Sequence, residues 1–211
     1  MSLTAWSAFY DEVMPGLPGI ETSIVDNALR NAAIELCTKS LIHKVTLDPF
    51  NTVIGTAEYD VSYDNSTVVA KINDGYVDTS TRIYPTTRDA LLASNTVWET
   101  DTGGVTHFLH TDHATIRLYR IPDAVQTISL NVSLAPARTA TGVEAFIYQR
   151  WLEGIASGAL KRLCAIPGKP WSSPELATYH GGQFALAISD ARIQATRDMT
   201  RDVLAVTPPI I

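Results

Sequence analysis

Apolar residues recur at three- and four-residue spacings near both ends of the chain, which is the pattern of helices that bury one face. The pattern predicts four helices, over residues 4–13, 21–43, 143–166 and 174–201. Stretches rich in Pro and Gly, at 14–19 and 167–170, end the first and third of them. In the third helix, Gly154 and Gly158 carry no side chain, so another backbone can approach closely.

The middle of the chain has a different pattern, with β-branched residues separated by turn formers such as Asn73-Asp74-Gly75. A short helix over residues 87–93 interrupts it. We expect strands at residues 44–47, 52–54, 57–61, 67–72, 75–78, 81–84, 96–100, 106–110, 115–120 and 127–134. Short strands at this spacing are typical of a small antiparallel sandwich or barrel.

These patterns predict an α+β fold in which about four α-helices from both chain ends form one bundle. Residues 1–44 and 142–201 are the predicted ring-forming helical bundle, and residues 45–141 are an inserted antiparallel β domain. Residues 202–211 form a mostly apolar tail that contains two prolines. We expect this tail to be extended and to dock on a partner, because free tails are usually polar.

Composition adds an indication of assembly. Of the 211 residues, 45% are hydrophobic, so a substantial core can form, but only 18% are charged. A monomer of this size usually carries more charge on its surface. The low charge is therefore consistent with a surface that is partly buried against other subunits.

The formal net charge is −6, and no run of basic residues is present. A protein that grips nucleic acid through its phosphates needs clustered Lys and Arg. A mildly acidic surface instead suits a passage along which DNA slides, because like charges repel. Acidic surfaces are also common among cytosolic proteins, so both interpretations stay open.

Nothing in the sequence predicts export or a membrane. The first residues lack the basic and apolar regions of a signal peptide, and no apolar run is long enough to cross a bilayer. Cys37 and Cys164 are the only cysteines, and both lie in apolar helical patterns, so we expect buried free thiols. We therefore expect the protein to be made in the cytoplasm.

The candidate chemistry is sparse. His107, His110, Asp112 and His113 include ligand types that bind zinc, but a regular strand places His107 and His113 on one face and His110 with Asp112 on the other. The favoured interpretation is a solvated hairpin. We predict no metal site, no cofactor and no catalytic residue.

Other polar residues have equally ordinary explanations. The acidic pairs Asp60 with Asp64 and Glu144 with Glu153 are conceivable glycosidase carboxylates, although nothing in their spacing selects them. We interpret four arginines of the β segment as interface or surface residues and the four tryptophans as core, with an interface anchor as the alternative for Trp98. The arginines are Arg82, Arg88, Arg117 and Arg120, and the tryptophans are Trp6, Trp98, Trp151 and Trp171.

The order of several short motifs resembles that of phage head-to-tail adaptor, or connector, proteins. After an N-terminal Trp and a Pro-Gly-Leu-Pro-Gly loop comes the segment 28–37, Ala-Leu-Arg-Asn-Ala-Ala-Ile-Glu-Leu-Cys. The segment 134–142 then leads into the helix containing Gly-Ala-Leu-Lys-Arg-Leu at 158–163. Pro-Gly-Lys-Pro-Trp at 167–171 and a last helix with Tyr179 complete the likeness, which covers nearly the whole chain.

This resemblance implies a structural virion protein of a tailed bacteriophage and not an enzyme. Such adaptors form dodecameric rings below the portal protein, extend the DNA channel and provide the platform for a tail, a nozzle or a tail-completion protein. The resemblance further implies location in the neck of the virion, and DNA that passes through the lumen without sequence-specific binding during genome ejection. In such adaptors the β insertion usually projects outward or toward the next component of the neck.

Three alternatives remain open from the sequence. A tail terminator or tail-completion protein is commonly a hexameric ring, so the number of subunits distinguishes it. A glycan-binding virion module would use the β domain to bind carbohydrate. A cell-wall enzyme would depend on a residue such as Glu144 or Glu153.

Overall fold

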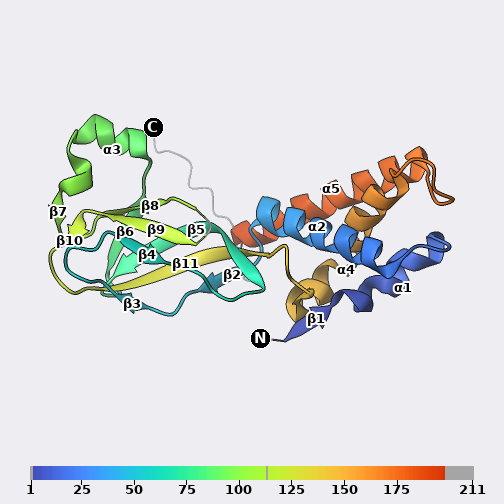
Figure 1. Ribbon diagram of the computed structural model, residues 1–211, viewed down its shortest axis with the longest axis horizontal. Coiled ribbons are helices and arrows are strands. Elements are labelled where there is room, and N and C mark those ends of the chain that lie inside the picture. Colours follow the sequence, from blue (N-terminus) through green and yellow to red (C-terminus); the bar gives the residue numbers. More distant parts are fainter. Residues whose placement is uncertain (1, 113, 198–211) are drawn as a thin grey trace, which may run out of the picture.

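The computed structural model describes residues 2–112 and 114–197. The molecule is elongated, with the long helices at one end and a curled sheet at the other (Figure 1). The fold is therefore mixed α+β, as predicted. The expected tail at 202–211 lies outside the described residues, as does His113.

The described residues contain five α-helices, and three of them are long. The helices are α1 (Tyr10–Val13), α2 (Thr22–Ser40), α3 (Arg88–Ser94), α4 (Ala145–Cys164) and α5 (Pro174–Arg197). Helices α2, α4 and α5 pack on one another, whereas α3 lies on the β region (Figure 1). Because α1 is a single turn, the predicted bundle of about four helices is not confirmed.

Glycines bring the three long helices close together. A Cβ added at Gly158 of α4 would lie 2.8 Å from Cβ of Ala32 in α2 and 2.7 Å from the ring of Phe184 in α5. A Cβ added at Gly154 would lie 2.8 Å from Cβ of Ala187 in α5. The expectation that these two glycines permit a close approach is therefore confirmed.

The segment predicted as a helix over residues 4–13 is only partly helical. Leu3–Ala5 form strand β1, and a 3-10 turn, η1 (Trp6–Phe9), precedes α1. Strand β1 pairs with β12 (Gly142–Glu144), just before α4. A Cβ at Gly142 would lie 2.1 Å from the carbonyl oxygen of Thr4, so this pairing requires glycine. A partner far along the chain thus overrides the local helical spacing.

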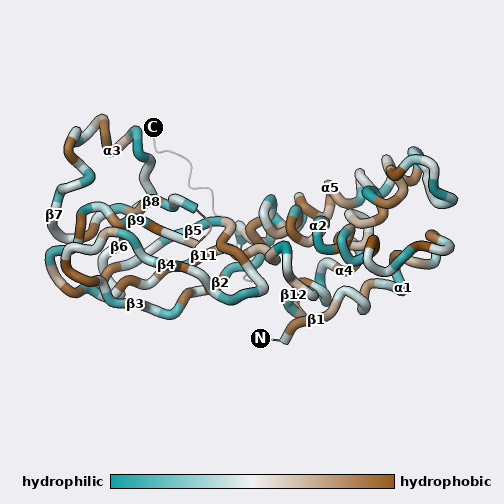
Figure 2. Tube along the Cα trace, viewed as in Figure 1, coloured by the Kyte–Doolittle hydropathy of each residue, from teal (hydrophilic) through white to brown (hydrophobic). Residues whose placement is uncertain are grey.

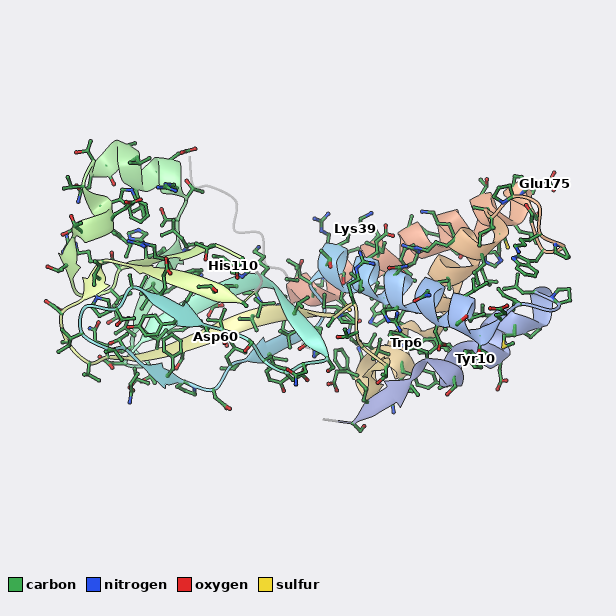
Figure 3. All side chains as sticks on the ribbon, in the orientation of Figure 1. Trp6, Tyr10, Lys39, Asp60, His110 and Glu175 are labelled. Carbon is green, nitrogen blue, oxygen red and sulfur yellow. The ribbon has the colours of Figure 1, made fainter. Side chains whose placement is uncertain are left out.

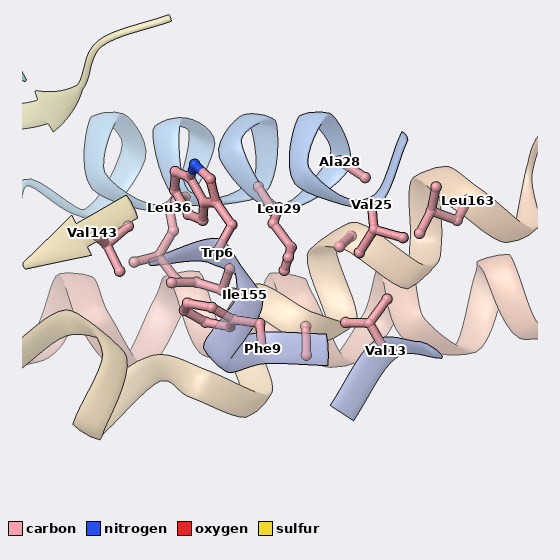
Figure 4. Packing of buried hydrophobic residues seen from close by; sticks show 14 of the residues in the cluster. Trp6, Phe9, Val13, Val25, Ala28, Leu29, Leu36, Val143, Ile155 and Leu163 are labelled. Carbon is pink, nitrogen blue, oxygen red and sulfur yellow. The ribbon is translucent and has the colours of Figure 1, made fainter. Parts of the chain in front are cut away.

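Hydrogen bonds and apolar contacts hold this N-terminal segment in place. The indole Nε1 of Trp6 donates to the carbonyl of Ala140 at 2.9 Å, and Arg30 Nε donates to the same oxygen at 3.0 Å. Figure 4 shows Trp6 and Phe9 inserted between α2 and α4. The N-terminal segment, helix α2 and the start of helix α4 therefore pack in one hydrophobic core.

The β region contains most of the strands, and its main sheet has the order β2-β11-β5-β6-β8-β9-β4, with β3 also paired to β11. Strands β7 and β10 form a separate pair. The bounds are β2 (Lys44–Thr46), β3 (Phe50–Asn51), β4 (Glu58–Asp60), β5 (Thr67–Val77), β6 (Thr81–Pro85), β7 (Thr102–Gly103), β8 (His107–His110), β9 (Thr115–Tyr119), β10 (Ile121–Pro122) and β11 (Thr127–Pro136).

The sheet curls into a half-barrel. Most neighbouring strands are antiparallel, as expected, but β6 with β8 and β7 with β10 are parallel. On the open side, the rings of Phe50 and Tyr59 lie 5.0 Å apart. This aromatic contact joins β3 to β4, which share no backbone pairing in the sheet.

Three predictions in the β region were wrong. Residues 52–54, predicted as a strand, form a loop after β3. No turn forms at Asn73-Asp74-Gly75, because β5 runs through it opposite β11. A Cβ at Gly75 would lie 2.8 Å from Leu130, so this glycine makes room for a core side chain. The strand predicted at 96–100 is instead the 3-10 turn η3 (Trp98–Thr100), which places Trp98 in a small buried cluster with Leu91.

Buried apolar residues gather in separate helical and β clusters. Trp6 and Trp171 belong to the helical cluster and Trp98 is also buried, so the assignment of these three to the core is confirmed. Trp151 is partly buried and packs against the helical cluster. The exact domain boundaries at 44/45 and 141/142 stay a prediction. Cys37 and Cys164 are buried free thiols, as expected.

The two regions meet where α2 leads into β2 and β11 leaves the sheet. Leu41 ends α2 in a left-handed conformation, with φ 58°. The amide of Leu134 donates to the carbonyl of His43 at 2.8 Å. The His43 ring is buried beside Phe146, with ring centroids 5.3 Å apart, and neither of its nitrogens has a hydrogen-bond partner among the described residues.

We predict that Gly158→Ala lowers the free energy of unfolding by about 1–3 kcal/mol, because the added methyl overpacks the contact among α2, α4 and α5. The matched control is Gly181→Ala in α5, where an added Cβ would lie 3.6 Å from the flexible side chain of Lys161, an ordinary contact distance. It should raise stability by up to about 1 kcal/mol, because alanine favours helix. Urea denaturation measures both changes. Equal behaviour of the two variants would contradict this view of the packing.

We predict a loss of stability in mild acid that depends on His43. Burial lowers the pKa of His43 to about 4, from the ordinary value of about 6.5. The unfolded chain therefore binds a proton more readily, and the free energy of unfolding should fall by up to roughly 3 kcal/mol as the pH drops from about 6.5 to 4. In His43→Phe this part of the fall should disappear. Urea denaturation of both proteins across this pH range measures the difference.

Candidate assembly surfaces

The most extensive exposed apolar surface on a long helix lies along α5. Leu176, Tyr179, Leu186 and Ile193 are each between 50% and 61% exposed. We call these four residues the outer face of α5. Hydrophobic positions recur along the whole helix (Figure 2).

The outer face exists because α5 is packed on one side only. Phe184, Ala191 and Ala195 are buried against the other helices, and α5 contacts both α4 and α2. Tyr179, Leu186 and Ile193 lie on the opposite side of the helix, and Leu176 lies at its flank. Exposed apolar rows of this kind mark sites of protein–protein contact in soluble proteins.

Few charges interrupt this surface. Helix α5 carries Glu175 near its start, Asp190 and Arg192 in its second half, and Arg197 at its end. Figure 3 shows Glu175 at the end of the molecule far from the β region. At the other end of α5, Lys44 Nζ donates to the carbonyl of Ala195 at 2.6 Å, which ties this helix to β2.

A second apolar surface lies in two loops that follow β3 and β10. Val53, Ile54 and Val125 are between 59% and 65% exposed. We call these three residues the β tip. The loops lie at the end of the β region farthest from the helices (Figure 1).

Hydrogen bonds hold the two loops of the β tip together. The amide of Thr52 donates to the carbonyl of Gln126 at 2.8 Å, and the amide of Gly55 donates to the carbonyl of Pro122 at 2.9 Å. The Thr52 hydroxyl donates to the carbonyl of Ala124 at 3.0 Å. The exposed apolar side chains therefore project from a braced support.

A pocket of about 430 Å³ lies between the α3 segment and the sheet. The guanidinium of Arg117 lies over the Trp98 ring, 5.1 Å from its centroid, and also pairs with Glu58 at 3.3 Å. Arg88 pairs with Glu99 at 2.7 Å. Because each arginine already has an acidic partner, the pocket has little net charge with which to select an ionic ligand.

The four arginines of the β segment all contact neighbouring side chains. Arg82 lies over the ring of Tyr84, 5.6 Å from its centroid, and Arg120 pairs with Asp101 at 3.1 Å. Together with the contacts of Arg88 and Arg117, these interactions brace the surface of the β region.

The histidine-rich segment forms a hairpin around β8 and β9. His107 lies between the rings of Tyr84 and Tyr119, at 6.2 and 6.1 Å. Asp112 accepts hydrogen bonds from the amides of Ala114 and Thr115, which lower its pKa. Across residues 2–112 and 114–197, no group of three or more His, Cys, Asp or Glu side chains is placed to hold a metal ion.

The structure does not bring the acidic residues together as the two pairs considered from the sequence. Glu153 is exposed on α4, whereas Glu144 is buried at the start of that helix. Burial raises the pKa of Glu144. Asp64 accepts hydrogen bonds from the amide of Ser66 and the hydroxyl of Thr67, two residues that line the same small cavity as Glu144. Asp60 lies in β4 and accepts a hydrogen bond from the amide of Ser62.

Sequence reasoning missed the proximity of Glu144 and His43 where the helices meet the β region. His43 and Glu144 line a cavity of about 10 Å³. A cavity of this size holds about one water molecule and no larger substrate. The position of Glu144 beside His43 depends on the pairing of β1 with β12. Neither of these strands has a local sequence signal that predicts the pairing.

The described helices include none that is both long and apolar enough to cross a membrane. The search of curated proteins found no match. The family model described as SU10 adaptor protein matches residues 6–207 and so spans both the helices and the β region. The chain therefore belongs to the SU10 adaptor protein family, a family of phage head-to-tail adaptors.

Proposed function

We propose that this virion component is a head-to-tail adaptor that forms a dodecameric ring below the portal protein in the neck. The ring extends the DNA channel and carries the tail, a nozzle or a tail-completion protein. The observation that carries this proposal is the family match over residues 6–207, which includes the helices and the inserted strands in one model.

The outer face of α5 supports assembly into a ring. Its four apolar residues are exposed, and Tyr179, Leu186 and Ile193 face away from the core of the subunit, on the most peripheral of the long helices. A head-to-tail contact around a closed ring uses two different surfaces of each subunit. We assign the outer face of α5 to one of these two surfaces, packed on the adjacent subunit.

The β tip supports attachment of the next neck component. Its three apolar residues project from two braced loops at the end farthest from the helices. Separate apolar surfaces at the two ends of the molecule allow one surface to build the ring and the other to bind the tail side.

The charge of the chain is compatible with a DNA passage. The net charge is −6, so a lumen lined by this protein repels the DNA phosphates and does not hold them. The role requires shape and adhesion instead of a chemical step, consistent with a structural family. Image reconstruction of the neck with twelve adaptor subunits would support the proposal, whereas a six-subunit ring at the tail end would favour a tail terminator.

We predict that phage carrying Leu186→Asp accumulate DNA-filled heads without tails, because a charge on the outer face of α5 opposes contact with the adjacent subunit. The control is Val97→Asp, which places the same charge on an exposed apolar residue of the α3 segment. Electron microscopy counts tailed particles, and gel analysis of purified heads measures adaptor occupancy. Normal occupancy in Leu186→Asp would refute the assignment of this face.

We predict a different defect for the double variant Val53→Asp/Val125→Asp. Purified heads should keep full occupancy by the adaptor but fail to join tails, because only the β tip is altered. Mixing these heads with purified tails and counting joined particles measures the defect. Loss of the adaptor itself from the heads would show that the β tip serves ring assembly.

A further inference from the structure

The exposed side of α5 carries two parallel rows of side chains with a seven-residue repeat. Large residues form one row, Tyr179, Leu186 and Ile193. Small residues form the neighbouring row, Gly182, Ser189 and Thr196. In the sequence the two rows alternate at spacings of three and four residues, which places them side by side on a helix.

An antiparallel pair about a two-fold axis brings like rows together. The large row of one helix lies against the large row of the second copy, where it buries apolar side chains. The small rows lie together beside it and let the two helix backbones approach closely. A second copy of the same helix therefore provides both halves of the contact.

The charges on α5 select one orientation. Glu175 and Arg197 lie eleven residues before and after Leu186. In an antiparallel pair centred on Leu186, each Glu175 meets Arg197 of the other copy, and Tyr179 packs beside Ile193. A parallel pair would place like charges together at both ends and would align the two helix dipoles unfavourably.

The surroundings of these residues leave them open to this contact. Leu186 is 61% exposed, and no ion pair within the described residues engages Glu175 or Arg197. Asp190 would lie near Gly182 and Gln183 of the second copy, where no acidic group opposes it. With 24 residues, α5 provides a contact about 36 Å long.

We propose that free chains pair through their α5 helices, antiparallel and about a two-fold axis at Leu186, before they enter the neck. A two-fold contact joins identical surfaces and cannot itself close a cyclic ring. The pair must therefore open before the ring forms. The pairing keeps the outer face of α5 covered in the free protein, which limits premature assembly and aggregation.

The first test measures the mass of the purified full-length chain in dilute solution by sedimentation equilibrium. We expect a dimer, and we expect Leu186→Asp to weaken it by at least about 30-fold, because two buried leucines become two opposed carboxylates. Val53→Asp in the β tip has similar initial exposure and should leave the dimer unchanged. A monomeric wild-type chain, or equal weakening by both variants, overturns the proposal.

The second test determines orientation with single cysteines under mild oxidation. The native Cys37 and Cys164 are buried and should not interfere. Leu186→Cys should form a disulfide-linked dimer, and a mixture of Tyr179→Cys with Ile193→Cys chains should form the mixed dimer. Efficient self-linking of Tyr179→Cys indicates a parallel pair and overturns the proposal, as does the absence of the mixed dimer.

The third test exchanges the end charges. Glu175→Arg and Arg197→Glu should each weaken the dimer by roughly 3- to 10-fold, and the double variant should restore it. Far-ultraviolet circular dichroism confirms that each variant remains folded. Failure of the double variant to recover contradicts the antiparallel register.

The outcome is separable from that of the adaptor role, because these experiments use free protein and the adaptor role is measured in virion necks. A monomeric free chain that forms rings on heads overturns the pairing alone. A dimeric free chain that is absent from necks overturns the adaptor role alone.

Discussion

The close approach of α2, α4 and α5 at Gly158 is the contact on which the rest of the structure depends. It joins a helix from the first part of the chain to two helices that follow the β region in sequence. Closing so long an intervening segment costs conformational entropy, which dense packing must offset. The methyl of Ala32 and the ring of Phe184 achieve this density because Gly158 has no side chain between them.

Several hydrogen bonds and one strand pair connect the packed helices to the β region. Trp6 and Arg30 share the carbonyl of Ala140, and β1 pairs with β12 at the entry to α4. On the other side, Lys44 ties the end of α5 to β2. The helices and the sheet are thus connected at several separate points. The apolar surfaces left over, the outer face of α5 and the β tip, are available to partners.

Local signals predicted the elements best where no distant partner competed. The apolar stripe of α2 and the Pro-rich boundary before α5 correspond to the observed helices within a few residues. The signals failed where a distant strand set the conformation. The sequence around Gly75 predicts a turn, yet Gly75 lies within β5, paired with Leu130 of β11. The Leu130 side chain occupies the volume that a side chain at position 75 would fill. Leu3–Ala5 likewise form a strand because β12 lies beside them.

The sequence by itself determined the mixed α+β class, the central position of the strands, the burial of the cysteines and of most tryptophans, and the resemblance to phage adaptors. These properties follow from composition and from spacings along the chain, which need no knowledge of distant neighbours. Only the tertiary structure decided which side of α5 stays exposed, how Phe50 and Tyr59 meet across the open side of the half-barrel, and that His43 and Glu144 line one small cavity. Each of these depends on contacts between residues far apart in sequence, whose energies arise only when the whole chain has packed.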